Sequence, residues 1–78
     1  MIAIREFMKT GGAAVNDDQL ISMMRARMHM EPLNQRSGWL QEIELLLDAY
    51  GTRPQLAAAA RMRDVLKQLA GEIRDVMN

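Results

Sequence analysis

The chain has 78 residues and a formal net charge of zero, from ten basic and ten acidic side chains. This length fits one domain with a thin core, and the balanced charge argues against a dedicated nucleic-acid binder, which is usually clearly basic. The sequence has no cysteine, which excludes disulfides and cysteine-based metal sites. Charged residues interrupt the first apolar stretch, so we expect neither a signal peptide nor a membrane-spanning segment, and we expect a cytoplasmic protein.

The first segment, residues 1–15, fits two structures. Ile2, Ile4 and Met8 alternate with other residues as in a strand, whereas Ile4, Phe7 and Met8 also suit a short helix. A single strand has no partner in a chain of helices, so we predict a short helix or a flexible arm that ends at the Gly11-Gly12 pair. A strand exchanged across a dimer is the alternative.

The next segment predicts a helix over residues 17–30. Asn16 is a good N-cap, and Gln19 stands three residues later, where a capping box requires it. Leu20, Met24 and Met28 lie on one face and are expected to enter the core. Pro32 disfavours helical backbone in the residue before it, which ends this helix.

A second helix is predicted over residues 38–50, with Ser37 as its cap and Gly51 as a left-handed residue after its end. Steps of three and four residues define the expected apolar face, which consists of Trp39, Ile43, Leu46 and Tyr50.

A third helix is predicted over residues 54–77, after a start signal at Thr52 and Gln55. Its expected apolar face consists of Ala59, Met62, Leu66, Leu69, Ile73 and Val76. The connection before it is very short, so the second and third helices should form an antiparallel hairpin. The sequence therefore predicts an all-α fold, in which residues 16–78 form a three-helix bundle behind an N-terminal arm or short helix.

The predicted first helix is rich in methionine, a flexible side chain that suits adaptable binding surfaces. Met23 and Met30 lie seven residues apart on one stripe, beside Arg25 and Arg27. These four residues are candidates for a partner or dimer interface. The alternative is a loosely packed core helix in which methionines fill gaps.

Three leucines of the predicted second helix, Leu40, Leu45 and Leu47, lie outside its expected apolar face. A thin bundle has little room for them, and exposed apolar patches usually mark an interface. We therefore add these three leucines to the interface candidates.

Charge is distributed unevenly along the chain. Residues 37–50 contain only acidic charges, whereas residues 20–36 are mainly basic. This pattern fits either a self-complementary or partner-steering surface, or attraction between the first two predicted helices within one chain, and we favour the second. The run Ala57–Ala60 fits either a close contact between helices or simple helix propensity.

Catalytic patterns are weak in this sequence. His29 is the only histidine and lacks a nearby co-ligand, so we expect it to be exposed near a helix end. The alanine-rich start of the third predicted helix offers almost no side chain that could read DNA bases. We expect no enzymatic activity, no metal or other cofactor, no small-molecule substrate, no membrane partner and no nucleic-acid partner.

The sequence thus favours a small protein–protein interaction module, an adaptor, regulator or inhibitor that docks an apolar helical face on a partner and forms a homodimer. Two alternatives stay open. One is a nucleic-acid-associated regulator of transcription, or of a phage or plasmid. The other is a structural subunit of a larger assembly.

Overall fold

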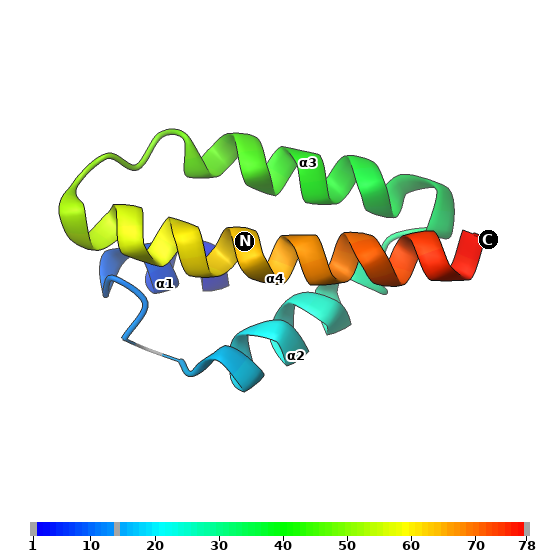
Figure 1. Cartoon of the computed structure of the whole chain (residues 1–78), viewed down its shortest axis with the longest axis horizontal. Helices are drawn as coiled ribbons and strands as arrows, with labels where there is room; N and C mark the ends of the chain where they lie inside the picture. Colours follow the sequence, from blue (N-terminus) through cyan, green and yellow to red (C-terminus); the bar gives the residue numbers. More distant parts are fainter. Residues whose placement is uncertain (1, 14, 78) are drawn as a thin grey trace.

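The computed structural model describes residues 2–13 and 15–77, so Met1, Ala14 and Asn78 of the sequence-based predictions lie outside the described residues. The described residues contain no strand and form four α-helices, together with one short 3-10 turn (Figure 1). In chain order these elements are α1 (Ile2–Lys9), α2 (Asp17–Met28), η1 (Leu33–Gln35), α3 (Arg36–Leu47) and α4 (Arg53–Met77). The predicted all-α class is confirmed.

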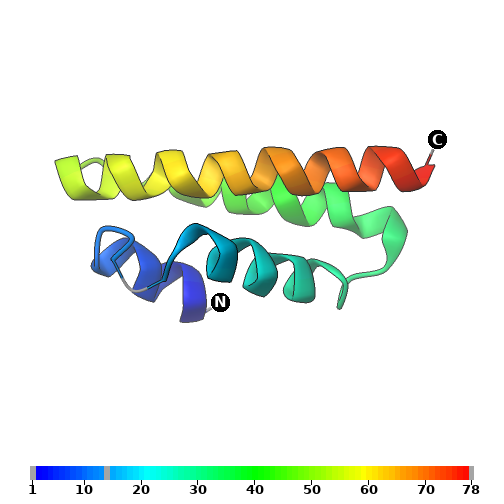
Figure 2. The same cartoon turned by 60° about the horizontal axis from the view of Figure 1, so that its bottom comes forward.

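Helix α4 is the element on which the others pack. It has 25 residues, which at 1.5 Å per residue gives about 37 Å, close to the longest extent of the molecule, 38 Å. Helices α1, α2 and α3 all contact it. Figures 1 and 2 show α3 antiparallel to α4 on one side, as predicted, and α1 and α2 in a layer on another side.

The N-terminal segment is a helix, as the short-helix alternative predicted. It is also part of the core, so the bundle has one helix more than the three predicted. The side chains of Ile4, Phe7 and Met8 are buried against the rest of the domain. Their burial excludes the flexible arm and the exchanged strand for the described part of this segment. An amphipathic helix of about two turns suffices here because α4 supplies an apolar surface for it.

Helix α1 ends in a Schellman motif. Gly11 donates to the Met8 carbonyl over 3.2 Å, and Gly12 donates to the Phe7 carbonyl over 2.9 Å. Both glycines have positive φ angles, 64° and 90°, in the region that a side chain disfavours. The Gly-Gly pair therefore turns the chain back toward α2.

The start of α2 was predicted correctly. The Asn16 side chain accepts from the Gln19 amide over 2.8 Å, and the Gln19 side chain accepts from the Asn16 amide over 3.0 Å. Leu20, Met24 and Met28 are buried as expected. The helix ends two residues earlier than predicted, and exposed His29 is its C-cap.

Helix α3 differs most from its prediction. The 3-10 turn η1 leads straight into α3, so Ser37 lies inside the first turn and does not cap it. Gly51 has no positive φ angle, which corrects its predicted left-handed role. Leu46 faces outward, while Leu40 and Leu47 are buried with Trp39 and Ile43.

Helix α4 follows its prediction closely. The Gln55 side chain accepts from the Thr52 amide over 3.2 Å, which is half of a capping box. The predicted apolar face is buried except at Val76, which lies in the last turn and is exposed. Ala58 and Ala59 are fully buried and allow close packing within the chain, whereas Ala57 and Ala60 of the same run are exposed.

No helix among the described residues is both long enough and apolar enough to cross a membrane.

Candidate protein-binding groove

The interface candidates in and just after α2 are two methionines and two arginines, and the structure places the two kinds of residue differently. Met23 and Met30 are exposed, Met30 by 76%. Arg25 is paired with Glu72 of α4. Arg27 pairs with a glutamate four residues later and lies over the Trp39 ring, 5.5 Å from its centroid. Both arginines therefore serve contacts within the chain.

The three leucine candidates of α3 do not share one surface. Leu45 is 69% exposed, as an interface residue should be, whereas Leu40 and Leu47 are only 6% and 1% exposed. Helix α3 turns a different face to the core than predicted, so the domain covers Leu47 and most of Leu40, although Leu40 also lines a groove between α3 and α4. Met23 and Leu40 line separate cavities, so the seven candidates form no single site.

The ion pairs also differ from the prediction. Attraction was expected between the basic α2 segment and acidic α3, but three of the four ion pairs among the described residues connect α4 to another part of the chain. Arg61 pairs with Asp17 over 2.8 Å, and Arg63 pairs with Asp48 over 3.0 Å. Helix α4 thus provides a charged partner for the segments on both of its sides.

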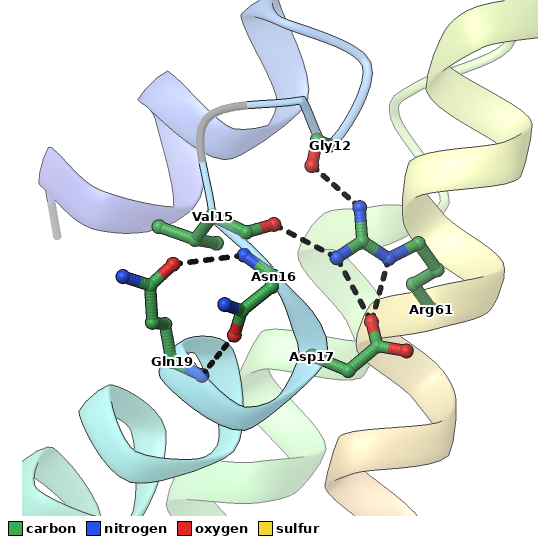
Figure 3. A network of polar contacts seen from close by, with 6 residues as sticks. All are labelled: Gly12, Val15, Asn16, Asp17, Gln19 and Arg61. Atoms are coloured by element: carbon green, nitrogen blue, oxygen red, sulfur yellow. Dashed lines mark hydrogen bonds and ion pairs between the residues drawn. The ribbon is translucent and has the colours of Figure 1, made fainter.

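Arg61 holds the connection between α1 and α2 against α4 (Figure 3). Its guanidinium donates to the Gly12 carbonyl, to the Val15 carbonyl over 2.9 Å and to the Asp17 carboxylate over 2.8 Å. The same group lies 5.2 Å from the centroid of the Phe7 ring, within the range of a cation–π contact. One side chain therefore fixes a turn, a helix start and an aromatic residue.

A second contact on this side of α4 is the bidentate pair of Arg25 and Glu72. Arg25 Nε donates to Oε1 over 2.9 Å, and Nη2 donates to Oε2 over 2.7 Å. These hydrogen bonds and the charge of Arg25 hold the pKa of the Glu72 carboxyl below its ordinary value, against a smaller opposing effect of burial. The same contact raises the pKa of Arg25.

On the α3 side of α4 lies an open groove of about 520 Å³. Its floor is apolar and consists of Leu40, Leu66, Ala70, Ile73 and Met77. One wall is basic and comes from α4, with Arg63, Lys67 and Arg74. The other wall is polar or acidic and comes from α3, with Ser37, Gln41 and Glu44. Four other cavities of the domain are smaller, with volumes between about 90 and 400 Å³.

The two walls carry different amounts of unpaired charge. Arg63 is paired with Asp48, but within the described part of the chain neither Lys67 nor Arg74 of the α4 wall lies in an ion pair, and both are exposed. Glu44 on the α3 wall is exposed and without an ion pair in the same residues. Of the predicted interface residues only Leu40 lines this groove. The α4 wall was not predicted, although the steps of four, three, four and three from Arg63 to Met77 mark a stripe beside the core face.

The chemistry of the groove suits binding. Among residues 2–13 and 15–77 no group of three or more histidine, cysteine or carboxylate side chains could hold a metal ion. The groove contains an apolar floor and flexible charged walls, which are the features of a surface that recognises another surface.

No known protein family matches the sequence, and no curated protein or solved structure matches the chain.

Proposed function

We propose that this chain is a protein–protein interaction module, an adaptor, regulator or inhibitor, whose α3–α4 groove receives an amphipathic helix of a partner protein. The observation that carries the proposal is the groove itself, an apolar floor between two charged or polar walls. Helix-in-groove binding is a common mode of recognition, in which apolar residues at every third or fourth position enter the groove.

The shape of the groove favours a helix as its occupant. Two antiparallel helices form its walls, and a third helix, about 10 Å wide, packs naturally between such a pair. From Arg63 to Met77 the α4 wall spans fourteen residue steps, about 21 Å. A partner helix of about four turns matches this length.

A second copy of the chain fits this groove less well. A two-fold dimer through this face would place groove against groove, and two concave faces leave a hollow between them. The homodimer expected from the sequence is therefore an alternative outcome of the experiment below. Acidic Glu44 and Asp48 beside the three cations also disfavour a phosphate backbone as the occupant.

The experiment uses selection from a displayed library of 18-residue helical peptides with a fixed apolar seam and random flanks. Binders are tested by NMR chemical-shift mapping and by fluorescence anisotropy. The blocking variant is Ala70→Arg, which fills the exposed floor of the groove. The matched control is Ala57→Arg, an exposed alanine of the same helix, about 140° around the helix axis from Ala70.

We expect shifts at the groove residues, at least tenfold weaker binding to Ala70→Arg, and unchanged binding to Ala57→Arg. A library without binders, or binders that tolerate Ala70→Arg, would contradict the proposal. Sedimentation equilibrium tests the homodimer, and a dimer that Ala70→Arg dissociates and Ala57→Arg does not would replace the partner helix with a second copy.

A further inference from the structure

From the unpaired charges of the groove we infer the charge pattern of its partner, an inference that rests on the proposed function. We propose that the partner helix carries two acidic residues seven positions apart on the flank that faces α4, and that this flank determines the direction in which the helix lies.

The α4 wall sets the spacing. Lys67 and Arg74 are seven residues apart, which places them about 10.5 Å apart along the axis on the same side of α4. Both are exposed and have no ion-pair partner among the described residues. Two carboxylates on neighbouring heptads of a docked helix match this distance, as flanking charges do in coiled coils.

The space between the two cations supports the same register. Ala70 stands between Lys67 and Arg74 and presents only a methyl group to the groove. An apolar side chain of the partner can therefore reach the floor between its two acidic residues, where Leu66 and Ile73 also contribute. One partner helix can therefore contact the apolar floor and both cations of the α4 wall at the same time.

The two walls differ enough to orient the partner. Glu44 is the charged residue of the α3 wall, and Ser37 and Gln41 are uncharged. An acidic flank on this wall would meet Glu44 and no cation, whereas on the α4 wall it meets two cations. Turning a helix end for end in a groove exchanges its flanks, so a single acidic flank selects one direction.

At one end of the groove the cation of the α4 wall is already paired within the chain. Arg63 of α4 reaches Asp48, just after α3, over 3.0 Å, so this cation is occupied. At the other end lies Met77, which is 66% exposed. The partner helix should therefore cover the stretch from Lys67 to Met77 and extend past Met77.

The experiment starts from the tightest peptide of the selection described above and changes only its flanks. Three versions carry two Glu, two Gln or two Lys seven residues apart on one flank, with a neutral opposite flank. Each is measured by fluorescence anisotropy against the wild type, the double variant Lys67→Glu/Arg74→Glu and the control Arg5→Glu/Arg53→Glu. The control makes the same charge change at exposed residues outside the groove, and urea unfolding verifies that each variant is folded.

We expect the wild type and the control to bind the Glu version about tenfold more tightly than the Lys version, because each exposed ion pair contributes a factor of about two to five. The double variant should reverse this order. Raising the salt concentration should reduce the preference, as expected for exposed charges. Equal binding of the three versions by the wild type, or an unchanged order in the double variant, overturns the charge inference and leaves the proposed function intact.

The direction has its own readout. A nitroxide label at the N-terminus of the Glu version should broaden amide signals at one end of the groove, and moving both Glu residues to the opposite flank should move the broadening to the other end. Broadening that stays at one end overturns the inferred orientation. A selection without any groove-binding peptide would instead remove the proposed function itself, so the two failures are distinguishable.

Discussion

The two sides of α4 use their charges in different ways. On the side of α1 and α2, Arg61 and Glu72 are bound to other parts of the chain through five hydrogen bonds. On the groove side only Arg63 has an ion-pair partner among the described residues, while Lys67 and Arg74 have none. Helix α4 thus has a closed side, where its charged groups are paired within the chain, and an open side, where two cations lack an ion-pair partner among the described residues.

This difference shows which charges stabilise the fold and which remain for another molecule. A cation bound to buried or half-buried carbonyls is costly to remove, because its removal leaves acceptors without a donor. An exposed cation without a partner contributes little to the stability of the chain. Each of the three predictions below therefore pairs a variant on the closed side with a control elsewhere on α3 or α4.

The largest effect is expected from Phe7→Ala, which removes a buried ring from under Arg61. Truncating a buried Phe costs about 3–5 kcal/mol, whereas Met77→Ala at the exposed end of the groove should cost less than about 0.5 kcal/mol. Urea unfolding followed by circular dichroism measures both. Similar midpoints for the two variants would show that α1 contributes no more to the fold than an exposed side chain.

The next effect concerns the turn after α1. A Cβ at Gly12 would lie 2.5 Å from Arg61 Nη1 in a backbone conformation with φ of 90°, so Gly12→Ala should cost about 1–3 kcal/mol. Gly71→Ala has no heavy atom within 4 Å of the added Cβ and should raise the stability by about 1 kcal/mol. Thermal unfolding of both variants tests whether the first substitution lowers the stability and the second raises it. A stabilising Gly12→Ala would mean that Arg61 does not hold this turn.

The smallest of the three effects is a pH dependence at Glu72. Because the folded pKa of Glu72 is lowered by Arg25, its stabilising effect is present above the unfolded pKa and disappears as the pH falls through the folded pKa. Glu72→Gln should therefore lower the unfolding midpoint at neutral pH, by less than half the effect of Gly12→Ala, and the difference from wild type should vanish in strong acid.

The comparison variant for Glu72 is Glu44→Gln, because the Glu44 carboxylate has no ion pair among the described residues. It should change the midpoint at neutral pH by less than Glu72→Gln does. If Glu72→Gln lowered the unfolding midpoint by the same amount in strong acid, the stabilising effect of Glu72 would not come from its charged pair with Arg25.

Local signals in the sequence were enough to predict α2 and α4. A capping box depends only on residues three apart, so Asn16 and Gln19 could be recognised directly. The apolar stripe of α4 is also clear because polar residues separate its members, and it was correct up to Ile73. The antiparallel hairpin followed from the short connection before α4.

Helix α3 could not be oriented in the same way. Its leucines occur on several faces, so spacing alone did not distinguish Leu46, which is exposed, from Leu47, which is buried. Packing against α4 makes this choice. Helix α1 presented the same difficulty, because its apolar residues fit both a strand and a helix until α4 provides a surface for them.

The groove and the Arg61 contacts depend on residues far apart in the sequence. Arg61 donates to the Gly12 carbonyl, 49 positions away in the sequence. Every residue has a backbone carbonyl, so the pattern of side chains does not indicate which carbonyl an arginine will contact. The floor of the groove combines Leu40 of α3 with residues of α4, so it exists only after the hairpin forms. Leu40, Leu45 and Leu47 were predicted as interface residues for their apolar surplus, but Leu47 lies in the core and only Leu40 of the three lines the groove.

The length of α4 has a consequence for how the molecule responds to force and to ligands. Because α1, α2 and α3 all contact this one helix, while α2 and α3 contact each other less, unravelling of α4 removes most of the packing between helices, and the domain should open as a single cooperative unit. The same backbone carries the floor of the groove on one side and Arg61 on the other. Unfolding of this helix should therefore open the groove and release the Arg61 contacts at the same time.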